Sequence, residues 1–572
     1  MALTIPGVEA LKVYQRRWLP KDLAAGLVLT TLLVPQGMAY AELAGLPPIT
    51  GLYTSILCLV GYAIFGPSRI LVLGPDSSLG PMIAATILPL IGAHGSPARA
   101  IALASMLAIL VGVLTILTGV ARLGFIADLL SKPTQIGYLT GLALTILIGQ
   151  LPKLFGFSVS ANGLIDEATK FVKGLAAGDA VPAAFGIGAA GLVLILALQR
   201  WLPRLPGILV VVVFSIIAAV VFDLASHDVS LVGTLPKGFP PFTLPDVSFS
   251  DLPILVAGAL GIALVSLTDT ISTSSAFAAR TGQEVNANQE MIGIGTANVA
   301  AGFFQGFAVS TSGSRTAVAE QSGAKTQVTG LVGAALILLM LLFVPGLLRN
   351  LPNPTLAAVV IAASLSLADV KGMVRLWRLR RVEFALAIAA FLGVALLGVL
   401  QGIAIAVGLS ILNVFRRAWW PYNTVLGRVE GIPGYHDTRS YPHAEHLAGL
   451  VIFRFDAPLF FANTRTFREE IRRLASADPT PRWIVVAAEP ITDVDTTAAD
   501  MLTDLDEALN ERGISLVFAE MKDPVRQKIE RYELTRTIDP NHFFPTLDAA
   551  VEAFRPEAGV RWEVPPEPPT EP

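Results

Sequence analysis

Over roughly its first four hundred residues the chain alternates long apolar runs with short polar breaks, a pattern typical of helices that cross a bilayer. Reading these runs gives about fourteen apolar segments. They cover residues 22–44, 50–66, 76–93, 98–120, 134–151, 182–201, 206–225, 253–276, 291–307, 312–321, 326–348, 353–368, 382–400 and 402–415. The pattern predicts an all-α polytopic membrane domain.

Two of these segments, which begin near Asp76 and Ser312, are shorter than the roughly 17–20 residues that a transmembrane helix needs. Each starts at a break of Gly, Pro or Ser residues. They are the third and the tenth segment, so each is the third member of a set of seven. Because seven is an odd number of spans, the second set crosses the membrane in the opposite direction to the first. The sequence thus predicts a 7+7 inverted repeat whose two broken helices face each other at the midplane.

Lys and Arg accumulate in cytoplasmic loops, so their positions predict the orientation of the chain. If the N-terminus lies inside, the inside loops carry Arg69, Arg122, Lys132, Arg200, Arg204, Arg280, Lys325, Arg375, Arg378, Arg380, Arg381, Arg416 and Arg417. Four lysines fall outside as exceptions: Lys153, Lys170, Lys173 and Lys237. The N-terminal stretch has no apolar core followed by a small-residue cleavage site, so we expect the first segment to stay in the mature protein. We expect a multi-pass protein of the plasma (inner) membrane, with its N-terminus and C-terminal domain in the cytoplasm.

The composition changes after the last apolar segment. Residues 418–445 are rich in Pro and Gly and predict a linker, whereas residues 446–556 alternate between strand-like and helix-like patterns and predict a small α/β domain. Residues 557–572 are rich in Pro and Glu, which predicts a disordered tail. The expected organisation is a cytoplasmic segment (1–21), a transport domain (22–417), the linker, the α/β domain and the tail.

Composition also excludes several classes of function. With 53% hydrophobic and 15% charged residues, the chain is too apolar for a soluble enzyme of 572 residues. A net charge of -3 leaves no basic stripe for a nucleic-acid partner. Cys58 is the single cysteine, which excludes disulfides within the chain and cysteine-based metal clusters. The sequence has no P-loop, metal-ligand cluster or nucleophile–base pair, so we expect neither an enzyme nor an NTP-driven pump, and no cofactor apart from a sodium ion.

Polar residues interrupt two apolar segments within the stretch 258–330. One segment carries Ser266, Thr268, Asp269, Thr270, Ser272 and Thr273, and the other breaks at the run 310–316, which includes Arg315. A charged side chain at the centre of a bilayer costs roughly +2.5 to +3.5 kcal/mol on insertion scales, so it normally faces a cavity or a partner. This stretch is therefore the first candidate for a functional site.

Several motifs resemble those of a known family. The run PQGMAYAELAGLPPITGLY (35–53) is similar to the first-helix signature of the sulfate permease (SulP) anion transporters. LGPDSSL, RLGFIADLLSKPTQIGYLTG, GQEVNANQE and SGSRTAVAEQSGAKTQ follow in the family's order. DVDTTAADML (493–502) stands in the place of the phosphorylation loop of an anti-anti-sigma (STAS) domain. The resemblance covers nearly the whole chain and identifies it as a SulP-like transporter with a C-terminal STAS domain.

This resemblance implies a fold of core and gate domains like that of the uracil permeases, and a homodimer. It implies an anion bound between the half-helices of spans three and ten and flanked by spans one and eight. The positions that match for substrate binding are Gln36, Tyr40, Pro75, Asp76, Ser77, Ser312, Gly313, Ser314 and Arg315. Those that match for cation coupling are Asp269 and Thr273. For Gln36 and Tyr40, packing between helices remains an alternative role.

The residue types favour anion chemistry at this place. Half-helices whose N-termini meet present free backbone N–H groups and positive dipole ends, which suit an oxyanion. Gly74–Pro75 and Ser312–Gly313 are suitable helix starts, because Pro lacks an orphaned donor and Gly permits close approach. Arg315 adds a fixed positive charge. We expect a net field that favours anions.

The acidic residues point to coupling with a cation. Asp269 with Thr273 at i+4 places a carboxylate and a hydroxyl on one helix face, which suits a small hard cation or a proton. Neutralising Asp269 would remove repulsion against an incoming anion, which is the basis of symport. Asp76 has two open interpretations, a proton carrier or an ion-pair partner of Arg315.

The predicted function is uptake of an inorganic oxyanion, most simply sulfate, with a proton or sodium by an elevator-type mechanism. The alternatives are sodium-dependent bicarbonate transport, dicarboxylate transport and an anion-sensing signalling protein. In the STAS-like domain, Thr496 and Thr497 follow Asp495 at a predicted helix start. Either Asp495 or Thr496 is the N-cap of this helix, or the two threonines belong to a regulatory loop that is phosphorylated or binds a protein partner.

Overall fold

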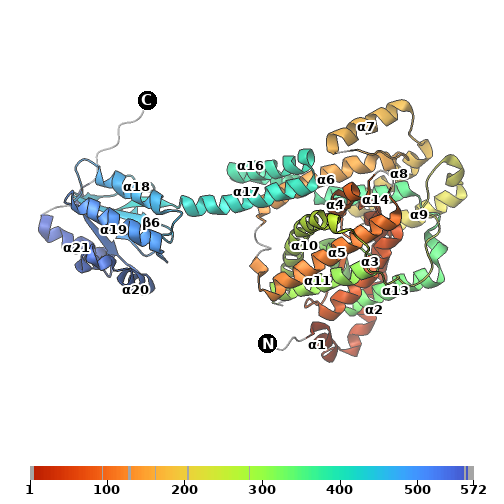
Figure 1. The fold of residues 1–572 in the computed structure, drawn as a ribbon, viewed down its shortest axis with the longest axis horizontal. Helices are drawn as coiled ribbons and strands as arrows, with labels where there is room; N and C mark the ends of the chain where they lie inside the picture. Colours follow the sequence, from red (N-terminus) through yellow and green to blue (C-terminus); the bar gives the residue numbers. More distant parts are fainter. Residues whose placement is uncertain are drawn as a thin grey trace. The chain divides into compact units, whose positions relative to one another are not determined.

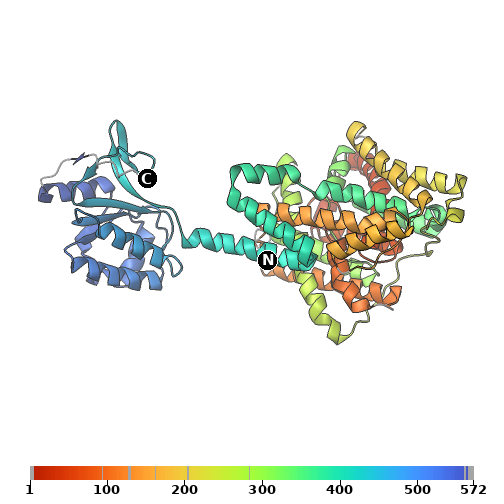
Figure 2. The same ribbon diagram turned by 90° about the horizontal axis from the view of Figure 1, so that it is seen from above.

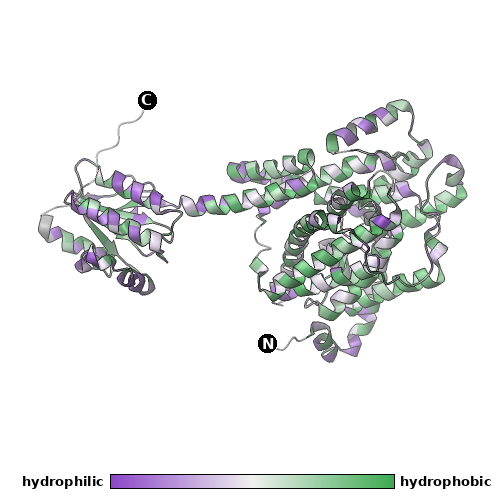
Figure 3. Ribbon diagram, viewed as in Figure 1, coloured by the Kyte–Doolittle hydropathy of each residue, from purple (hydrophilic) through white to green (hydrophobic). Residues whose placement is uncertain are grey.

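The computed structural model describes residues 5–92, 95–125, 130–161, 163–202, 205–281, 284–558 and 562–563. The chain forms two compact units, Met1–Ile411 and Leu412–Pro572 (Figure 1). The first unit is helical and largely hydrophobic, whereas the second alternates hydrophobic strands with helices that have hydrophilic outer faces (Figure 3).

Apolar helices build the first unit. The helices of this unit are α1 (Pro6–Lys12), α2 (Leu19–Leu43), α3 (Pro48–Phe65), α4 (Gly80–Ile91), α5 (Pro97–Val120), α6 (Lys132–Leu154), α7 (Leu164–Ala177), α8 (Pro182–Trp201), α9 (Gly207–Val221), α10 (Leu252–Thr281), α11 (Ala287–Phe303), α12 (Gly313–Gln321), α13 (Val328–Phe343), α14 (Asn353–Leu367), α15 (Val370–Leu379), α16 (Arg381–Leu392) and α17 (Val399–Trp419), which continues into the second unit. Eight helical stretches of the described chain are long and apolar enough to cross a bilayer, and α4, α9 and α13 are shorter apolar helices. Each of the fourteen predicted apolar segments overlaps a helix of this unit; α11, α12 and α16 lie in three of these segments and are outside both of those groups.

The helices of this unit pack in two groups. In the first, α2, α3, α5, α10, α11 and α13 lie against one another, and in the second, α6 lies between α14 and α16, with α8 against α14 (Figures 1 and 2). Small residues allow the closest approaches: a Cβ added at Gly51 of α3 would lie 1.9 Å from the carbonyl oxygen of Gly37 in α2. This division agrees with the predicted core and gate domains.

Two short strands link the halves of the membrane unit. β1 (Leu73–Gly74) pairs antiparallel with β2 (Ser310–Thr311), and the amide of Ser312 donates to the carbonyl of Val72 at 3.0 Å. Helix α12 begins directly after β2, with Ser312 as its N-cap, as predicted.

The predicted start of the other half-helix is wrong. Helix α4 begins at Gly80 and not at Gly74–Pro75, because Gly74 belongs to β1 and a turn follows it. In that turn the carboxylate of Asp76 accepts a hydrogen bond from the amide of Ser78 at 2.9 Å, and its carbonyl accepts from Gly80 at 3.2 Å. Such local bonds from an Asp side chain compete with the first helical turn.

The second unit is an α/β domain. Its elements are β3 (Asn423–Val429), β4 (Ile432–Asp437), β5 (His446–Leu447), β6 (Leu450–Phe455), α18 (Thr464–Ala475), β7 (Trp483–Ala487), α19 (Thr496–Asn510), β8 (Ser515–Ala519), α20 (Asp523–Arg531), β9 (Phe543–Phe544), α21 (Leu547–Ala558) and β10 (Trp562–Glu563). The main sheet has the order β4-β3-β6-β7-β8-β9, in which β6 to β9 are parallel and β3 is antiparallel to both neighbours. One core packs α18, α19 and α20 on one face of the sheet, and another packs α21 on the opposite face.

The predicted linker, 418–445, is part of this domain. It carries β3 and β4, which form a hairpin at the edge of the sheet. Gly431 lies at the turn with φ of 80°, a conformation that glycine adopts without strain. The Pro and Gly residues therefore mark a hairpin and its approach and not a free connection. Of the predicted disordered tail, 557–572, most residues lie outside the part that the structure describes.

Candidate functional site

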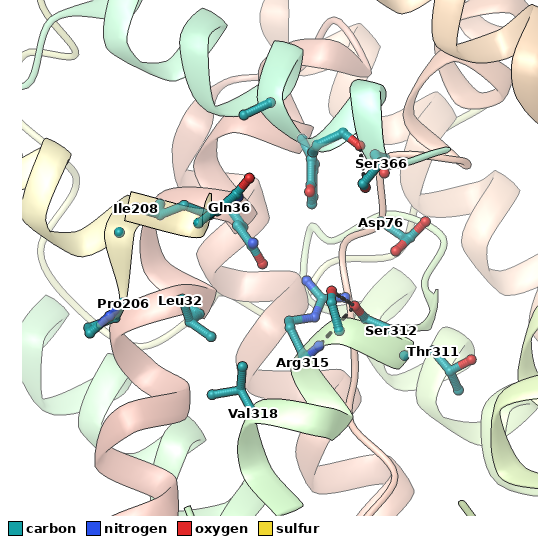
Figure 4. A pocket seen from close by; sticks show the side chains of 18 of the residues that line it. Leu32, Gln36, Asp76, Pro206, Ile208, Thr311, Ser312, Arg315, Val318 and Ser366 are labelled. Atoms are coloured by element: carbon teal, nitrogen blue, oxygen red, sulfur yellow. Dashed lines mark hydrogen bonds between the residues drawn. The ribbon is translucent and has the colours of Figure 1, made fainter. Parts of the chain in front are cut away.

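A cavity of about 1230 Å³ lies within the membrane unit, between the two groups of helices (Figure 4). Helices α2, α6, α8, α9, α10, α12 and α14 and the turn before α4 line it. Its polar lining residues include Thr31, Gln36, Tyr40, Asp76, Ser77, Ser78, Gln199, Asp269, Ser272, Thr273, Thr311, Ser312, Ser314, Arg315, Gln321, Ser322 and Ser366. Most of the residues predicted for substrate and cation binding therefore surround one space.

Arg315 is the most distinctive residue of this cavity. Its side chain is 1% exposed, and its Nη1 donates a hydrogen bond to the carbonyl of Pro75 at 2.7 Å. Its Nε and Nη2 have no hydrogen-bond partner among the described residues. In Figure 4 the guanidinium points toward the space between Gln36 and Asp76. A buried guanidinium with unused donors favours an anion with several oxygens.

The N-terminus of α12 adds to the positive field. Ser312 accepts a hydrogen bond from the amide of Arg315, and the hydroxyls of Ser312 and Ser314 lie 3.1 Å apart. Gly313 is exposed to the cavity, and a Cβ added there would lie 3.9 Å from the methyl carbon of Thr273. The helix dipole and the first amides of α12 thus lie beside Arg315, an arrangement that favours negative charge.

Two carboxylates of the cavity lining are joined by one hydroxyl. Ser78 Oγ lies 2.7 Å from Asp76 Oδ1 and 3.4 Å from Asp269 Oδ2. Gln135 of α6 donates to Asp269 Oδ1 at 3.4 Å. Among the described residues no ion pair joins Arg315 to Asp76 or Asp269, so the structure does not support the pairing of Asp76 with Arg315.

The structure places the predicted residues as follows. Gln36 and Tyr40 lie on α2 and line the cavity. They are only 9% and 5% exposed, so most of each side chain packs against other residues. Pro75 does not line the cavity, but its carbonyl oxygen positions Arg315. Thr273 lies one turn after Asp269 on α10 and beside the start of α12.

Sequence reasoning missed two residues of this network, Ser78 and Gln135. Both lie in motifs that carry the family resemblance, and both are polar residues at the edge of an apolar segment, which was the available signal. The hydroxyl of Tyr138 on α6 was also missed; it is buried and has no partner among the described residues.

The predicted regulatory residues lie in the second unit, where Thr496 and Thr497 are exposed at the start of α19. Asp495 is the N-cap: its carboxylate accepts from the amides of Ala498 and Phe461, each at 2.8 Å. The N-cap interpretation is thus confirmed for Asp495. Nearby, the ammonium of Lys528 lies 2.5 Å from Asp493 and lowers the pKa of that carboxyl. Across the described residues no cluster of three or more His, Cys, Asp or Glu side chains could hold a metal ion.

Comparisons with known proteins agree with this architecture. The profile of the sulfate permease family matches residues 19–390, and that of the STAS domain matches residues 441–550. A probable sulfate transporter of Mycobacterium tuberculosis (strain ATCC 25618 / H37Rv) is 42% identical over 551 residues, which cover 96% of this chain and 98% of the relative. Probable sulfate transporter 4.2 of Arabidopsis thaliana is 31% identical and covers 93% of this chain and 80% of its own length.

Solved structures show the same fold. The murine Slc26a9 anion transporter in its inward-facing state superimposes with a TM-score of 0.87 at 24% identity, over 96% of this chain and 94% of that chain. The transmembrane domain of the cyanobacterial bicarbonate transporter BicA gives a TM-score of 0.60 at 22% identity, over 70% of this chain and 98% of that domain. The fold class is thereby confirmed as a helical membrane domain followed by an α/β STAS domain. With a family profile that matches most of its length and relatives that share its whole architecture, this chain belongs to the sulfate permease family of membrane transporters.

Proposed function

We propose that the protein is a secondary active transporter that takes up sulfate together with a cation. The observation that carries this proposal is the buried guanidinium of Arg315 at a cavity beside the N-terminus of α12. Its Nε and Nη2 find no hydrogen-bond partner in the described part of the chain. A tetrahedral oxyanion offers several acceptor oxygens to these donors. The names of the relatives, probable sulfate transporters, support sulfate as the anion.

In this proposal the substrate residues divide into three groups. Arg315 and the amides and hydroxyls of Ser312, Gly313 and Ser314 bind the anion directly. The remaining substrate positions complete the wall: Gln36, Tyr40, Asp76 and Ser77. Pro75 holds Arg315 in place through its carbonyl oxygen.

Asp269 and Thr273 couple the cation in this mechanism. Two carboxylates that share the Ser78 hydroxyl repel each other and repel an incoming anion, so a sodium ion or proton at Asp269 lowers the cost of anion binding. The anion and the cation therefore favour each other's binding, which is the thermodynamic basis of symport. Movement of α2, α10 and α12, which carry the proposed binding residues, against the group of α6, α8, α14 and α16 then gives elevator-type alternating access.

The topology belongs to the same proposal. We infer a 7+7 inverted repeat, a homodimer, and an N-terminus and STAS domain that face the cytoplasm from the plasma membrane. In both halves an amphipathic helix follows the fifth span, α7 after α6 and α15 after α14, which supports the repeat. Exposed Thr496 and Thr497 remain candidates for phosphorylation or partner binding.

The test is uptake of labelled anions into proteoliposomes under imposed sodium or proton gradients. We expect sulfate uptake driven by one of the two gradients, lost in Arg315→Gln and uncoupled from the gradient in Asp269→Asn. Val318→Ala and Ser272→Ala change residues that line the same cavity and are not among the hydrogen-bond partners of Arg315 or Asp269, so they serve as controls that keep uptake. Gradient-driven uptake of bicarbonate or a dicarboxylate in place of sulfate would reassign the substrate, and no transport of any anion would favour a sensor.

A further inference from the structure

Helix α15 is a short amphipathic helix between two membrane helices. Its residues, Val370–Leu379, follow α14, which ends at Leu367, and precede α16, which begins at Arg381. Because consecutive spans end and begin at the same side of a bilayer, both ends of α15 are fixed at one membrane surface. None of its residues is buried in the protein.

One face of α15 is apolar and uncovered. At about 100° per residue, Val370, Val374 and Trp377 share this face. Their exposed fractions are 62%, 45% and 55%. The flanking helices also expose apolar side chains next to α15, Leu365 of α14 at 45% and Val382 of α16 at 46%. A bilayer is therefore the apolar environment within reach of this face.

The adjacent face, about 100° around the helix axis, is basic. Lys371, Arg375 and Arg378 follow at i, i+4 and i+7, and with Val374 and Leu379 they line a shallow groove of about 260 Å³. No described residue forms an ion pair with any of the three. The next two arginines along the chain do have partners, a carboxylate of α16 and the ring of Trp377. The basic face therefore keeps three free cations beside an exposed apolar face.

We propose that α15 lies in the headgroup layer of the bilayer and binds anionic phospholipids through Lys371, Arg375 and Arg378. A basic amphipathic helix binds an interface by inserting its apolar face at the acyl boundary and attracting anionic headgroups with its polar face. Each basic residue near such a surface contributes an attraction that corresponds to roughly a fivefold preference. The charge of this face and its attachment to two spans both fit a lipid surface as the occupant.

Helix α7 provides a matched control within the chain. It also connects two apolar helices, α6 and α8, and is amphipathic with exposed Ile165 and Val172. Its charges are balanced, however, because Asp166 and Glu167 accompany its two lysines and Asp166 pairs with Lys170 at 2.8 Å. It should show no preference for anionic lipid.

The first experiment measures which lipids the full-length protein retains. The protein is reconstituted in phosphatidylcholine with a fraction of phosphatidylglycerol, and retained lipids are counted by native mass spectrometry. We expect enrichment of phosphatidylglycerol that falls roughly fivefold for each charge removed among Lys371→Gln, Arg375→Gln and Arg378→Gln, and no change when both lysines of α7 are replaced by Gln. Equal retention of the two lipids by the wild type, or unchanged enrichment in the triple variant, would overturn the proposal.

The second experiment locates the apolar face. Cys58 is the only cysteine and is buried, so Val374→Cys in a Cys58→Ala background accepts a single fluorescent label. We expect quenching by nitroxide-labelled lipids and protection from aqueous iodide. Quenching by iodide alone would place the face in water, and protection from both quenchers would show that protein covers it; either result contradicts the proposal. Neither experiment depends on transport.

Discussion

Ser78 has one hydroxyl proton for two neighbouring carboxylates, those of Asp76 and Asp269. This arrangement offers a way to identify the coupling ion. In Ser78→Ala a sodium site loses an oxygen ligand, so the half-saturating sodium concentration should rise. A proton site instead loses a competing hydrogen-bond donor, so the proton concentration that gives half-maximal uptake should fall. A hydrogen bond to a charged group is worth roughly 1.5–3 kcal/mol, so the shift should be about tenfold or more.

The measurement is the cation dependence of sulfate uptake in proteoliposomes. Ser366→Ala is a suitable control, because Ser366 lines the same cavity but bonds to the carbonyl of Ala363 and not to a carboxylate. An unchanged cation dependence in Ser78→Ala would show that this hydroxyl has no part in coupling.

Asp506 gives a pH-dependent prediction for the STAS domain. Burial raises the pKa of this carboxyl to about 6, although Asn510 donates to it at 3.0 Å. Its stabilising contribution is complete below the unfolded pKa of about 4 and is lost as the pH rises through about 6. Asp506→Asn should therefore stabilise the domain at pH 7 by roughly 1–3 kcal/mol, and by much less at pH 4.

Hydrogen exchange of the α19 amides in the full-length protein, corrected for the intrinsic effect of pH, measures this difference. Asp504→Asn changes an exposed carboxylate of the same helix and should have little effect at either pH. Equal protection of Asp506→Asn and wild type at pH 7 would contradict the prediction.

At the level of residues, the sequence predicted the ionised groups of the site better than the groups that connect them. Arg315 and Asp269 are conspicuous because charge is expensive inside an apolar segment. Ser78 and Gln135 carry no such cost, since hydroxyl and amide groups are common between membrane helices. Their roles depend on which atoms of distant segments meet, which no local pattern contains.

The approach of α2 to α3 is an interaction between elements that tolerates no side chain. Gly51→Ala would place a Cβ 1.9 Å from the Gly37 carbonyl oxygen, so the two helix backbones would have to move apart. We expect a loss of stability of about 1–3 kcal/mol or more, measured as unfolding of the purified protein in detergent. Gly186→Ala in α8 is the matched control: nothing lies within 4 Å of its added Cβ, and Ala favours a helix over Gly. Equal stability of the two variants would contradict this packing.

Asp22 fastens the start of α2 to the connection between α12 and α13. Its fully buried carboxylate accepts hydrogen bonds from the amide of Lys325 at 2.7 Å, from the amide and hydroxyl of Thr326 and from the hydroxyl of Thr329. Each buried donor left unsatisfied costs about 1–3 kcal/mol, so Asp22→Ala should destabilise the protein by roughly 3 kcal/mol or more.

Denaturant unfolding in detergent checks this prediction. Asp22→Asn keeps one acceptor oxygen and should cost less, and Glu9→Ala removes an exposed carboxylate of α1 and should cost little. If Asp22→Ala unfolds at the same denaturant concentration as Glu9→Ala, the anchoring role is wrong.

Element boundaries followed from the sequence where hydropathy was decisive. The apolar helices were predicted because their runs are long, whereas α7 and α15 are amphipathic and average to a polar loop. The composition of residues 418–445 predicts a linker because Pro and Gly residues at turns outweigh the short strands β3 and β4. The start of α4 depends on how Asp76 bonds within its own turn, which competes with the helix signal of Gly and Pro.

At the scale of the whole molecule, the proposed inverted repeat predicts that α7 and α15 lie on opposite sides of the membrane. Lys173→Cys and Lys371→Cys, each in the Cys58→Ala background, expose a thiol on the polar face of each helix. In right-side-out vesicles a membrane-impermeant maleimide should label position 173 and leave position 371 unlabelled, and inverted vesicles should reverse this result. Labelling of both positions from one side would contradict the repeat and the proposed orientation.

The family, the two-unit organisation and many residues of the candidate cavity were accessible from the sequence, because ordered motifs and a change of composition carry them. The substrate and the coupling ion were not. They depend on small free-energy differences among a few polar atoms around one cavity, and the same residue types suit several small anions.

The pairing of β1 with β2 allows the anion specificity of such a protein to change during evolution. Leu73 pairs with Thr311 and Gly74 with Ser310 through main-chain bonds, which do not depend on the residue types in the rest of the cavity lining. Mutations that alter the cavity lining can therefore accumulate without dismantling the frame that holds both half-helices. Related proteins can therefore keep the same fold and differ in anion specificity through substitutions at a few lining positions.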